Sequence, residues 1–561
     1  MGMAQTSIPQ AVRRAAEHGG SLTVLDASMR PTRLSLRELD ERATATAVGL
    51  RHLGVAPGDR VCVLAPTTPR MLLALFGLWR LGAVPVMLPH ERRADDTETR
   101  ALIAHRVAVS GAKALITDRA PELRALLGRA VRPADGSPSA GVGDLDGVRV
   151  LGLDEATAGG AGPVPPVPEA DRLGMLQFTS GTTGTSKAVP VLQGQLIGNV
   201  LTCMETLDMR PGHTYVSWLP FYHDMGIVSV VGLLSQGVHT VVLPTENFLR
   251  RPSCWMETVS TWRAEITAAP NSAYRLAAKA QQLRPANLDL SRLRVAINGA
   301  EPVTADIVDE TLQVLGKSGM PVESLCPTYG MAETTLVVSA ASADRAVRIL
   351  SPGEGPSGGE YPRPARPLVS CGRPLRGTEV TVHAASGEEL PEGHIGEVQV
   401  RGPGVTGGYW TGPGAPPAGS GILEDGRLRT GDLGFLYEGE LYVCGRIKDM
   451  IIVGGRNLYP EDYEIAAEGV PGVRPGHVIA FSLPDAERMV VVAEGVGGEE
   501  TLRRTARELF DRLRTVVQHA PAEVVVVRAA TLPRTSSGKK RRGACRDMYL
   551  TGALQVVCGA R

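Results

Sequence analysis

The segment TSGTTGTSK, residues 179–187, combines residue types that bind phosphate. Its two glycines let backbone N–H groups approach an anion closely, while its hydroxyls and terminal ammonium can donate hydrogen bonds to it. A nucleotide-binding P-loop would require Gly, four residues and then Gly-Lys-Ser/Thr, and that pattern is absent here. We therefore predict a phosphate-binding loop of another kind, formed by Thr179, Ser180, Gly181, Thr182, Thr183, Gly184 and Lys187.

A single glycine loop is weak support for any activity, but further motifs follow it in a definite order. These are LPFYHDMG (219–226), NGAEPV (298–303), PTYGMAETTL (327–336), RTGDLG (429–434), GRIKDMIIVGGRNLYPEDYE (445–464) and LPRTSSGK (532–539). The series resembles the adenylate-forming superfamily of acyl-CoA synthetases, peptide-synthetase adenylation domains and luciferases. Within it, SWLPFYHDMG, YGMAETTL, LVSCGRPL and IIVGGRNLYPEDYE most resemble the fatty acyl-AMP ligase branch.

The resemblance implies an ATP-dependent reaction in two steps. A carboxylate first displaces pyrophosphate to form an acyl-adenylate, and a thiol then displaces AMP. The loop at 179–187 would accordingly hold the β- and γ-phosphates. The expected cofactors are ATP and Mg²⁺, with CoA or carrier-protein phosphopantetheine as the acceptor.

The nucleotide-side residues follow from the same resemblance. Tyr329, with Gly330, would stack on adenine, and Asp432 would accept the ribose hydroxyls. Arg446 would make a second ribose or phosphate contact. The adenine-side strand end would be formed by Asn298, Gly299 and Ala300, whereas Glu301 is expected to be structural.

Three residues are candidates for the chemistry itself. Glu333 would bind Mg²⁺ on the phosphates, since hard oxygen ligands suit that ion. His223 would lie near the reacting carboxylate, although a buried structural histidine is an equal alternative, and the adjacent Asp224 is expected to be structural. Lys539 would neutralise charge on the α-phosphate and bridging oxygens. In the alternative, Lys539 is one of several solvated charges in the basic run at 539–542.

Secondary structure must position these residues, and the sequence pattern predicts alternating strands and helices. Apolar runs at 60–66, 83–89 and 113–118 predict buried strands, and the run at 70–83 predicts a helix between them. Short strands are also expected at 239–244, 265–270 and 293–299. The Gly-, Pro- and Ala-rich stretch 156–171 is expected to be a surface loop, and the sequence becomes β-rich after about residue 370.

We expect two domains joined by a hinge. The fold class is α/β: a large N-terminal domain (1–444) of layered α/β subdomains plus a β-rich subdomain, and a small mobile α+β C-terminal domain (449–561). The hinge would be 445–448, with Lys448 at the position about which the family's C-terminal domain rotates between its two reactions.

Composition narrows the possible partners. The 561 residues exceed one ordinary core, and equal totals of 59 basic and 59 acidic residues give no bulk attraction to nucleic acid. No apolar stretch approaches the ~20 residues of a membrane helix. Eight scattered cysteines without close pairs favour reduced thiols over a zinc site, so a cytoplasmic enzyme is expected.

The acyl substrate and the acceptor are less defined. Walls from 218–237 and 269–276 would form an apolar pocket for a hydrophobic carboxylic acid, either fatty or a bulkier natural-product acid. The loop-rich interval 340–367 occupies the position of a ligase-branch insertion that disfavours free CoA, which favours an acyl carrier protein as partner. The alternatives are an acyl-CoA synthetase, a luciferase-type oxidase and a non-catalytic acyl- or nucleotide-binding homologue.

Overall fold

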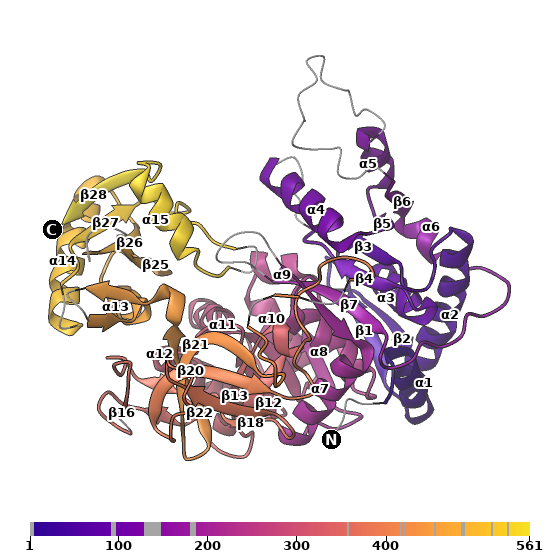
Figure 1. Ribbon diagram of the computed structural model, residues 1–561, viewed down its shortest axis with the longest axis horizontal. Coiled ribbons are helices and arrows are strands. Elements are labelled where there is room, and N and C mark those ends of the chain that lie inside the picture. Colours follow the sequence, from indigo (N-terminus) through magenta and orange to yellow (C-terminus); the bar gives the residue numbers. More distant parts are fainter. Residues whose placement is uncertain are drawn as a thin grey trace.

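The computed structural model describes residues 5–90, 97–127, 147–179, 187–355, 358–415, 418–419, 421–453, 456–483, 488–517, 520–535 and 538–560. The predicted loop residues Ser180, Gly181, Thr182, Thr183 and Gly184 lie outside this part of the chain. The fold is a mixed α/β arrangement of several sheets, with a large N-terminal and a small C-terminal domain, as the sequence predicts (Figure 1).

A nine-stranded sheet forms the centre of the N-terminal domain. Its order is β18-β14-β13-β12-β11-β9-β10-β1-β2, and the strands from β13 to β1 pair in parallel. Their bounds are β1 Ser21–Leu25, β2 Pro31–Ser35, β9 Thr214–Ser217, β10 His239–Val242, β11 Ile266–Pro270, β12 Val295–Gly299, β13 Leu325–Gly330, β14 Val337–Ala340 and β18 Arg373–Pro374.

A second, fully parallel sheet has the order β4-β3-β5-β6. Strands β3, β4 and β5 match the predicted runs, because parallel strands are buried on both faces and read as continuous apolar segments, whereas β6 was not predicted. The bounds are β3 Arg60–Leu64, β4 Val84–Met87, β5 Ala114–Thr117 and β6 Arg149–Gly152. An antiparallel pair, β7 Leu173–Phe178 and β8 Ala188–Leu192, flanks the phosphate-loop segment.

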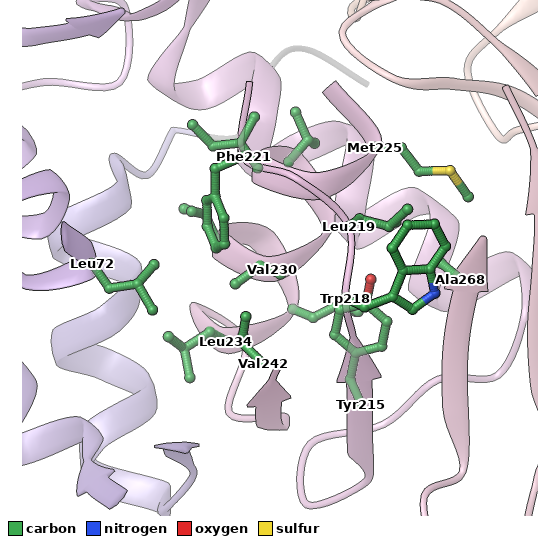
Figure 2. Close-up of a cluster of buried hydrophobic side chains, with 14 of the residues drawn as sticks. Leu72, Tyr215, Trp218, Leu219, Phe221, Met225, Val230, Leu234, Val242 and Ala268 are labelled. Carbon is green, nitrogen blue, oxygen red and sulfur yellow. The ribbon is translucent and has the colours of Figure 1, made fainter. Parts of the chain in front are cut away.

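Helices pack between and around these sheets. Helix α8 (Asp224–Leu234) lies among α3 (Pro69–Leu81), α7 (Gln193–Thr206) and the central sheet, where Trp218, Phe221 and Leu234 join one apolar cluster (Figure 2). The other helices of this domain are α1 Ile8–His18, α2 Leu36–His52, α4 Thr97–Ser110, α5 Ala120–Leu127, α6 Leu153–Thr157, α9 Thr245–Arg250, α10 Ser253–Thr261, α11 Asn271–Leu283 and α12 Ala305–Leu315.

The predicted β-rich region is a five-stranded sheet of order β16-β20-β21-β22, with β19 paired to β20. Its last strand ends at Arg446, at the start of the predicted hinge. The bounds are β16 Gly358–Gly359, β19 Glu379–His383, β20 His394–Arg401, β21 Leu428–Tyr437 and β22 Glu440–Arg446, with a small neighbouring pair β15 Ile349–Leu350 and β17 Leu368–Val369.

The C-terminal domain has its own four-stranded sheet, β25-β26-β27-β28, with apolar packing on both faces. Alternate residues of β25 divide between the two faces: Val478 and Ala480 pack with α13 and α14, whereas Ile479 and Phe481 face the side that carries α15. The bounds are β25 Val473–Leu483, β26 Arg488–Gly495, β27 Glu523–Val527, β28 Val556–Ala560, α13 Pro460–Glu468, α14 Glu499–Val516 and α15 Arg542–Leu550, with a hairpin β23 Ile451–Val453 and β24 Arg456–Leu458.

The cysteine thiols are unpaired, and most of them are buried. All eight cysteines are free thiols, and each is buried except Cys558, which is half-buried on β28. Burial raises the pKa of the Cys62, Cys203 and Cys371 thiols to about 12. Within the described residues, no helix has the length and apolar character needed to cross a membrane.

Candidate functional site

A cavity of about 1200 Å³ lies where the two domains meet, and most of the predicted site residues line it. From the N-terminal domain they are Thr179, Lys187, His223, Ala300, Tyr329, Gly330, Glu333 and Asp432; Arg446 and Lys448 of the predicted hinge and Lys539 complete the set. Asn298 and Gly299 do not line it. They are completely buried at the end of β12, behind Ala300.

Lys539 reaches the cavity from a tight loop. The backbone N–H of Lys539 donates to the Thr535 hydroxyl (3.0 Å), and the Thr535 N–H donates back to the Lys539 carbonyl (2.9 Å). Gly538 has a φ of 82°, a left-handed conformation that glycine adopts without steric cost. The loop therefore presents Lys539 from a defined backbone position.

Two of the other three basic side chains in the run 539–542 are engaged elsewhere. The Lys540 ammonium lies 2.8 Å from a Glu464 carboxylate oxygen, and the Arg542 guanidinium contacts Glu464, Glu461 and Asp449 at 2.7–2.9 Å. Within this run, Lys540 and Arg542 therefore hold the loop to α13, whereas Lys539 faces the cavity. This arrangement weighs against a merely solvated Lys539.

His223 and Asp224 begin α8 on the opposite wall. His223 is the N-cap residue, and its Nδ1 lies 3.8 Å from the Asp224 carboxylate. Burial would raise the pKa of Asp224, but His223 and the positive charge of Lys539 together lower it. Asp224, which the sequence predicted as structural, thus lines the cavity beside the candidate catalytic lysine.

Glu333 is held by a residue that the sequence motifs did not reveal. The Tyr409 hydroxyl donates to the Glu333 carboxylate (2.8 Å), and the Lys187 ammonium lies 4.5 Å from the centre of the Tyr409 ring. Tyr409 thereby connects the carboxylate to the end of the phosphate loop. Only its place in the fold identifies it, because it lies 76 residues from Glu333 in the chain.

One carboxylate suits a magnesium ion that is carried by a nucleotide. Mg²⁺ commonly binds through one or two carboxylates plus substrate phosphates and water, without an all-protein cage. Among the described residues, no group of three or more His, Cys, Asp or Glu side chains is arranged to hold a metal. Glu333 beside a phosphate loop fits this chemistry.

Asp432 is the centre of a hydrogen-bonded group on the β-rich subdomain. It is buried, accepts a hydrogen bond from the Tyr329 hydroxyl (2.7 Å) and pairs with the Arg446 guanidinium (2.8 Å). Asp432 and Arg446 lie directly opposite each other in the β21–β22 register. Burial and the Asp432 charge raise the pKa of Tyr329 well above its ordinary value, which keeps the phenol protonated.

The ends of β12 and β13, at Gly299 and Gly330, have room only for residues without a Cβ atom. A Cβ atom on Gly330 would lie 1.8 Å from the Leu336 carbonyl oxygen, and one on Gly299 would lie 2.5 Å from the Thr328 hydroxyl. Ala300 has a φ of 64°, a strained left-handed conformation for a non-glycine residue. Glu301 accepts hydrogen bonds from the Ser272 N–H and hydroxyl, which agrees with the predicted structural role.

Two arginines of the N-terminal domain contact α13 of the C-terminal domain. Arg366 pairs with Asp462 and also donates to the Cys444 carbonyl. Arg275 pairs with Glu468 (2.5 Å) while it also contacts Asp306 and Glu310 of α12. These contacts hold the C-terminal domain in the orientation that places Lys539 in the cavity.

Comparisons with known proteins identify the family of the chain. The profile of the AMP-binding enzyme family matches residues 12–410. The chain is 30% identical to the long-chain-fatty-acid–AMP ligase of Mycolicibacterium smegmatis over 94% of this chain and 90% of that protein. It is 31% identical to the medium-chain-fatty-acid–[acyl-carrier-protein] ligase of Moorena producens over 93% of this chain and 90% of that protein.

A solved structure supports the same assignment. It comes from a study of fatty acyl-adenylate ligases from E. coli and L. pneumophila, superimposes with a TM-score of 0.84 and is 27% identical, covering 98% of each chain. The extent of the match and the order of the motifs leave one assignment: the chain belongs to the AMP-binding enzyme family and is an adenylate-forming ligase.

Proposed function

We propose that the protein activates a fatty or other hydrophobic carboxylic acid with ATP and passes the acyl group to the phosphopantetheine thiol of an acyl carrier protein. One observation supports the first half of this proposal, the activation of the acid with ATP. Lys539, Glu333 and the Asp432–Tyr329 pair line a single cavity, whose lining also includes apolar side chains such as Met225 and Leu233. The fatty-acid AMP ligases among the relatives support the same reaction.

In the first step, a carboxylate oxygen forms a bond to the α-phosphorus of ATP while the bond from that phosphorus to the bridging oxygen breaks. Pyrophosphate leaves with the bonding electrons, and the acyl-adenylate stays in the cavity. Lys539 neutralises charge that develops on the phosphate oxygens, and Asp432 accepts hydrogen bonds from the ribose. Glu333 would hold Mg²⁺, which supplies charge neutralisation on the departing phosphates.

The remaining predicted residues surround the same reaction. Thr179, Lys187 and the five loop residues between 180 and 184 would bind the β- and γ-phosphates, and His223 would lie beside the reacting carboxylate. Tyr329 and Gly330 would contact the adenosine, next to the strand end of Asn298, Gly299 and Ala300. Lys448, in a short 3₁₀ turn after β22, would be the hinge between domains 1–444 and 449–561.

In the second step, a thiol sulfur attacks the acyl carbonyl and AMP leaves. This step requires the C-terminal domain to rotate away, and the interval 340–367 supplies a restraint. Arg366 is buried against Asp462 of α13, and the rotation would break this ion pair, which is costly because both charges lose a close partner. A docked carrier protein would bring a whole interface to offset that cost.

The Moorena producens relative, which is named for transfer to an acyl carrier protein, supports the same acceptor. An acyl-CoA synthetase is the second candidate, because a phosphopantetheine thiol is common to both acceptors. The free, mostly buried cysteines are consistent with a reducing compartment such as the cytoplasm.

Product analysis tests the proposal. The purified protein is incubated with ATP, Mg²⁺ and a panel of fatty and aromatic acids, with either CoA or a phosphopantetheinylated carrier protein, and the products are identified by mass spectrometry. We expect acyl-AMP and pyrophosphate in all reactions with the correct acid, and acyl transfer to the carrier protein only. Acyl-CoA as the main product would overturn the carrier-protein assignment, and the absence of any adenylate would overturn the proposal as a whole.

A further inference from the structure

The cavity has an apolar branch that starts beside the reacting groups. Helix α8 begins at Asp224, which lines the same cavity as Lys539, and its residues Met225, Ser229 and Leu233 line this cavity as well. Residues four apart lie on one face of an α-helix, so these three form a continuous wall that leads away from the reaction centre. We call this branch the acyl channel.

The far end of the acyl channel is closed by well-packed side chains. Val200 and Cys203 of α7, Met209 after that helix and Leu233 of α8 all line the cavity, yet each is at most 5% exposed. The two helices touch at this level, because a Cβ atom on Gly232 would lie 2.3 Å from a Val200 methyl carbon. The channel therefore ends against α7 within the protein interior.

The length of the acyl channel follows from helix geometry. Met225 and Leu233 are eight residues apart, which corresponds to about 12 Å at a rise of about 1.5 Å per residue. An extended chain advances about 3.3–3.6 Å for every three backbone bonds, so a staggered alkyl chain covers this length in roughly ten bonds. A longer straight chain would meet Cys203, Met209 and Leu233.

The walls also limit the chemistry of the chain. The Ser229 hydroxyl contacts the Tyr215 hydroxyl (2.8 Å) and donates to the Met225 carbonyl, so it has partners within the protein. Ala268, a small side chain on β11, lies on the same side of α8 as Met225 (Figure 2). A second carboxylate or a hydroxyl on the substrate would be buried among Val200, Leu233 and Met209 without a partner, which is costly.

We infer that the substrate is an unsubstituted, straight, medium-chain fatty acid of about ten to twelve carbons, a length set by the channel and by helix geometry. This inference rests on the proposed function, because it identifies the acid that the adenylation site takes. Cys203, Met209 and Leu233 are then the residues that determine chain length.

The test measures kcat/KM for pyrophosphate release across straight-chain acids from butanoic to octadecanoic. We expect a maximum at decanoic or dodecanoic acid and a loss of about tenfold or more by hexadecanoic acid, because extra methylenes must displace packed side chains. Equal use of decanoic and hexadecanoic acids would overturn the length assignment. Release of pyrophosphate with none of the acids would instead count against the proposed function.

A matched pair of variants tests the residues that set the length. Leu233 lines the channel, whereas its neighbour Leu234, about 100° further round α8, points toward Leu72 of α3 (Figure 2). Leu233→Ala should move the maximum toward longer acids by about two carbons, the length of the deleted side-chain atoms. Leu234→Ala creates a similar core cavity and should leave the maximum in place.

Cys203→Phe supplies the opposite change and should move the maximum toward shorter acids. It also keeps the inference testable if Leu233→Ala does not fold, as judged by its melting curve. A maximum that stays fixed in folded Leu233→Ala or Cys203→Phe, or that moves equally in Leu234→Ala, would overturn the assignment.

Discussion

At the scale of single residues, Lys539 is distinguished from its neighbours by what it contacts. Lys540 and Arg542 are tied to acidic residues of α13, whereas Lys539 faces the cavity and lowers the pKa of Asp224 across it. In the proposed mechanism, a charge in this position would act on the phosphate oxygens only while the C-terminal domain keeps its present orientation. Its contribution should therefore be confined to one of the two half-reactions.

We predict that Lys539→Ala slows acyl-AMP formation by about 10²–10³-fold, the range found when one transition-state donor is removed. The variant should still convert a supplied acyl-AMP to the thioester at the normal rate, which controls for folding and acceptor binding. Rapid-quench measurement of each half-reaction checks both. Adenylate formation at the normal rate would remove Lys539 from the proposed mechanism.

Single residues also show what the sequence can and cannot reveal. Tyr329, Glu333, Asp432 and Lys539 lie in short local motifs, so their convergence on one cavity is predictable from the resemblance. Tyr409 and Arg366 were missed because their partners are 76 and 96 residues away, and only the fold brings them together. The strands were predictable because buried parallel strands leave continuous apolar runs.

At the scale of elements, the acidic residues of α13 form ion pairs with basic residues from several parts of the chain. Its four acidic residues are Glu461, Asp462, Glu464 and Glu468, and each has a basic partner. Burial would raise the pKa of Glu464, but Arg542 and Lys540 lower it from 4.5 to about 2. Helix α13 thus contacts both the N-terminal domain and the loop that carries Lys539.

The lowered pKa of Glu464 predicts a specific acid sensitivity. Because the folded state favours the carboxylate, its stabilisation is complete above pH 4.5 and is lost as the pH falls toward 2. The difference in unfolding free energy between wild type and Glu464→Gln should therefore shrink by about 3 kcal/mol over that interval. Urea unfolding at several pH values measures it.

Glu499→Gln is the control for this measurement, since its ion pair with Arg503 is exposed. That variant should track the wild type at every pH, because exposed ion pairs contribute little to stability. A pH-independent gap between wild type and Glu464→Gln would show that Arg542 and Lys540 do not keep the carboxylate ionised.

At the scale of the whole molecule, ion pairs join the two domains, and the proposed rotation would have to separate them. Arg275 keeps Asp306 and Glu310 as partners within its own domain, so losing Glu468 does not leave it alone. This contact is accordingly a weaker restraint than the buried Arg366–Asp462 pair. It should tune the balance between the two orientations without fixing it.

We predict that Glu468→Gln raises the ratio of acyl-transfer rate to adenylation rate about fivefold, equivalent to losing about 1 kcal/mol from a partly exposed pair. Glu310→Gln is the matched control. Glu310 lies 3.6 Å from the same arginine, but both residues belong to the N-terminal domain, so this contact does not cross between the domains. Single-turnover rates of both half-reactions give the ratio. Equal ratios in the two variants would exclude a role for the Arg275–Glu468 contact in the rotation.

The burial of the cysteines gives the molecule a natural attachment point for a dye. Seven of the eight thiols are buried, whereas Cys558 is half-buried on β28 of the C-terminal domain. A maleimide fluorophore would therefore label the wild-type chain selectively at that strand, without cysteine substitutions elsewhere. The polarisation of this fluorophore, or energy transfer to it from a donor on the large domain, would then report the movement of the C-terminal domain in real time.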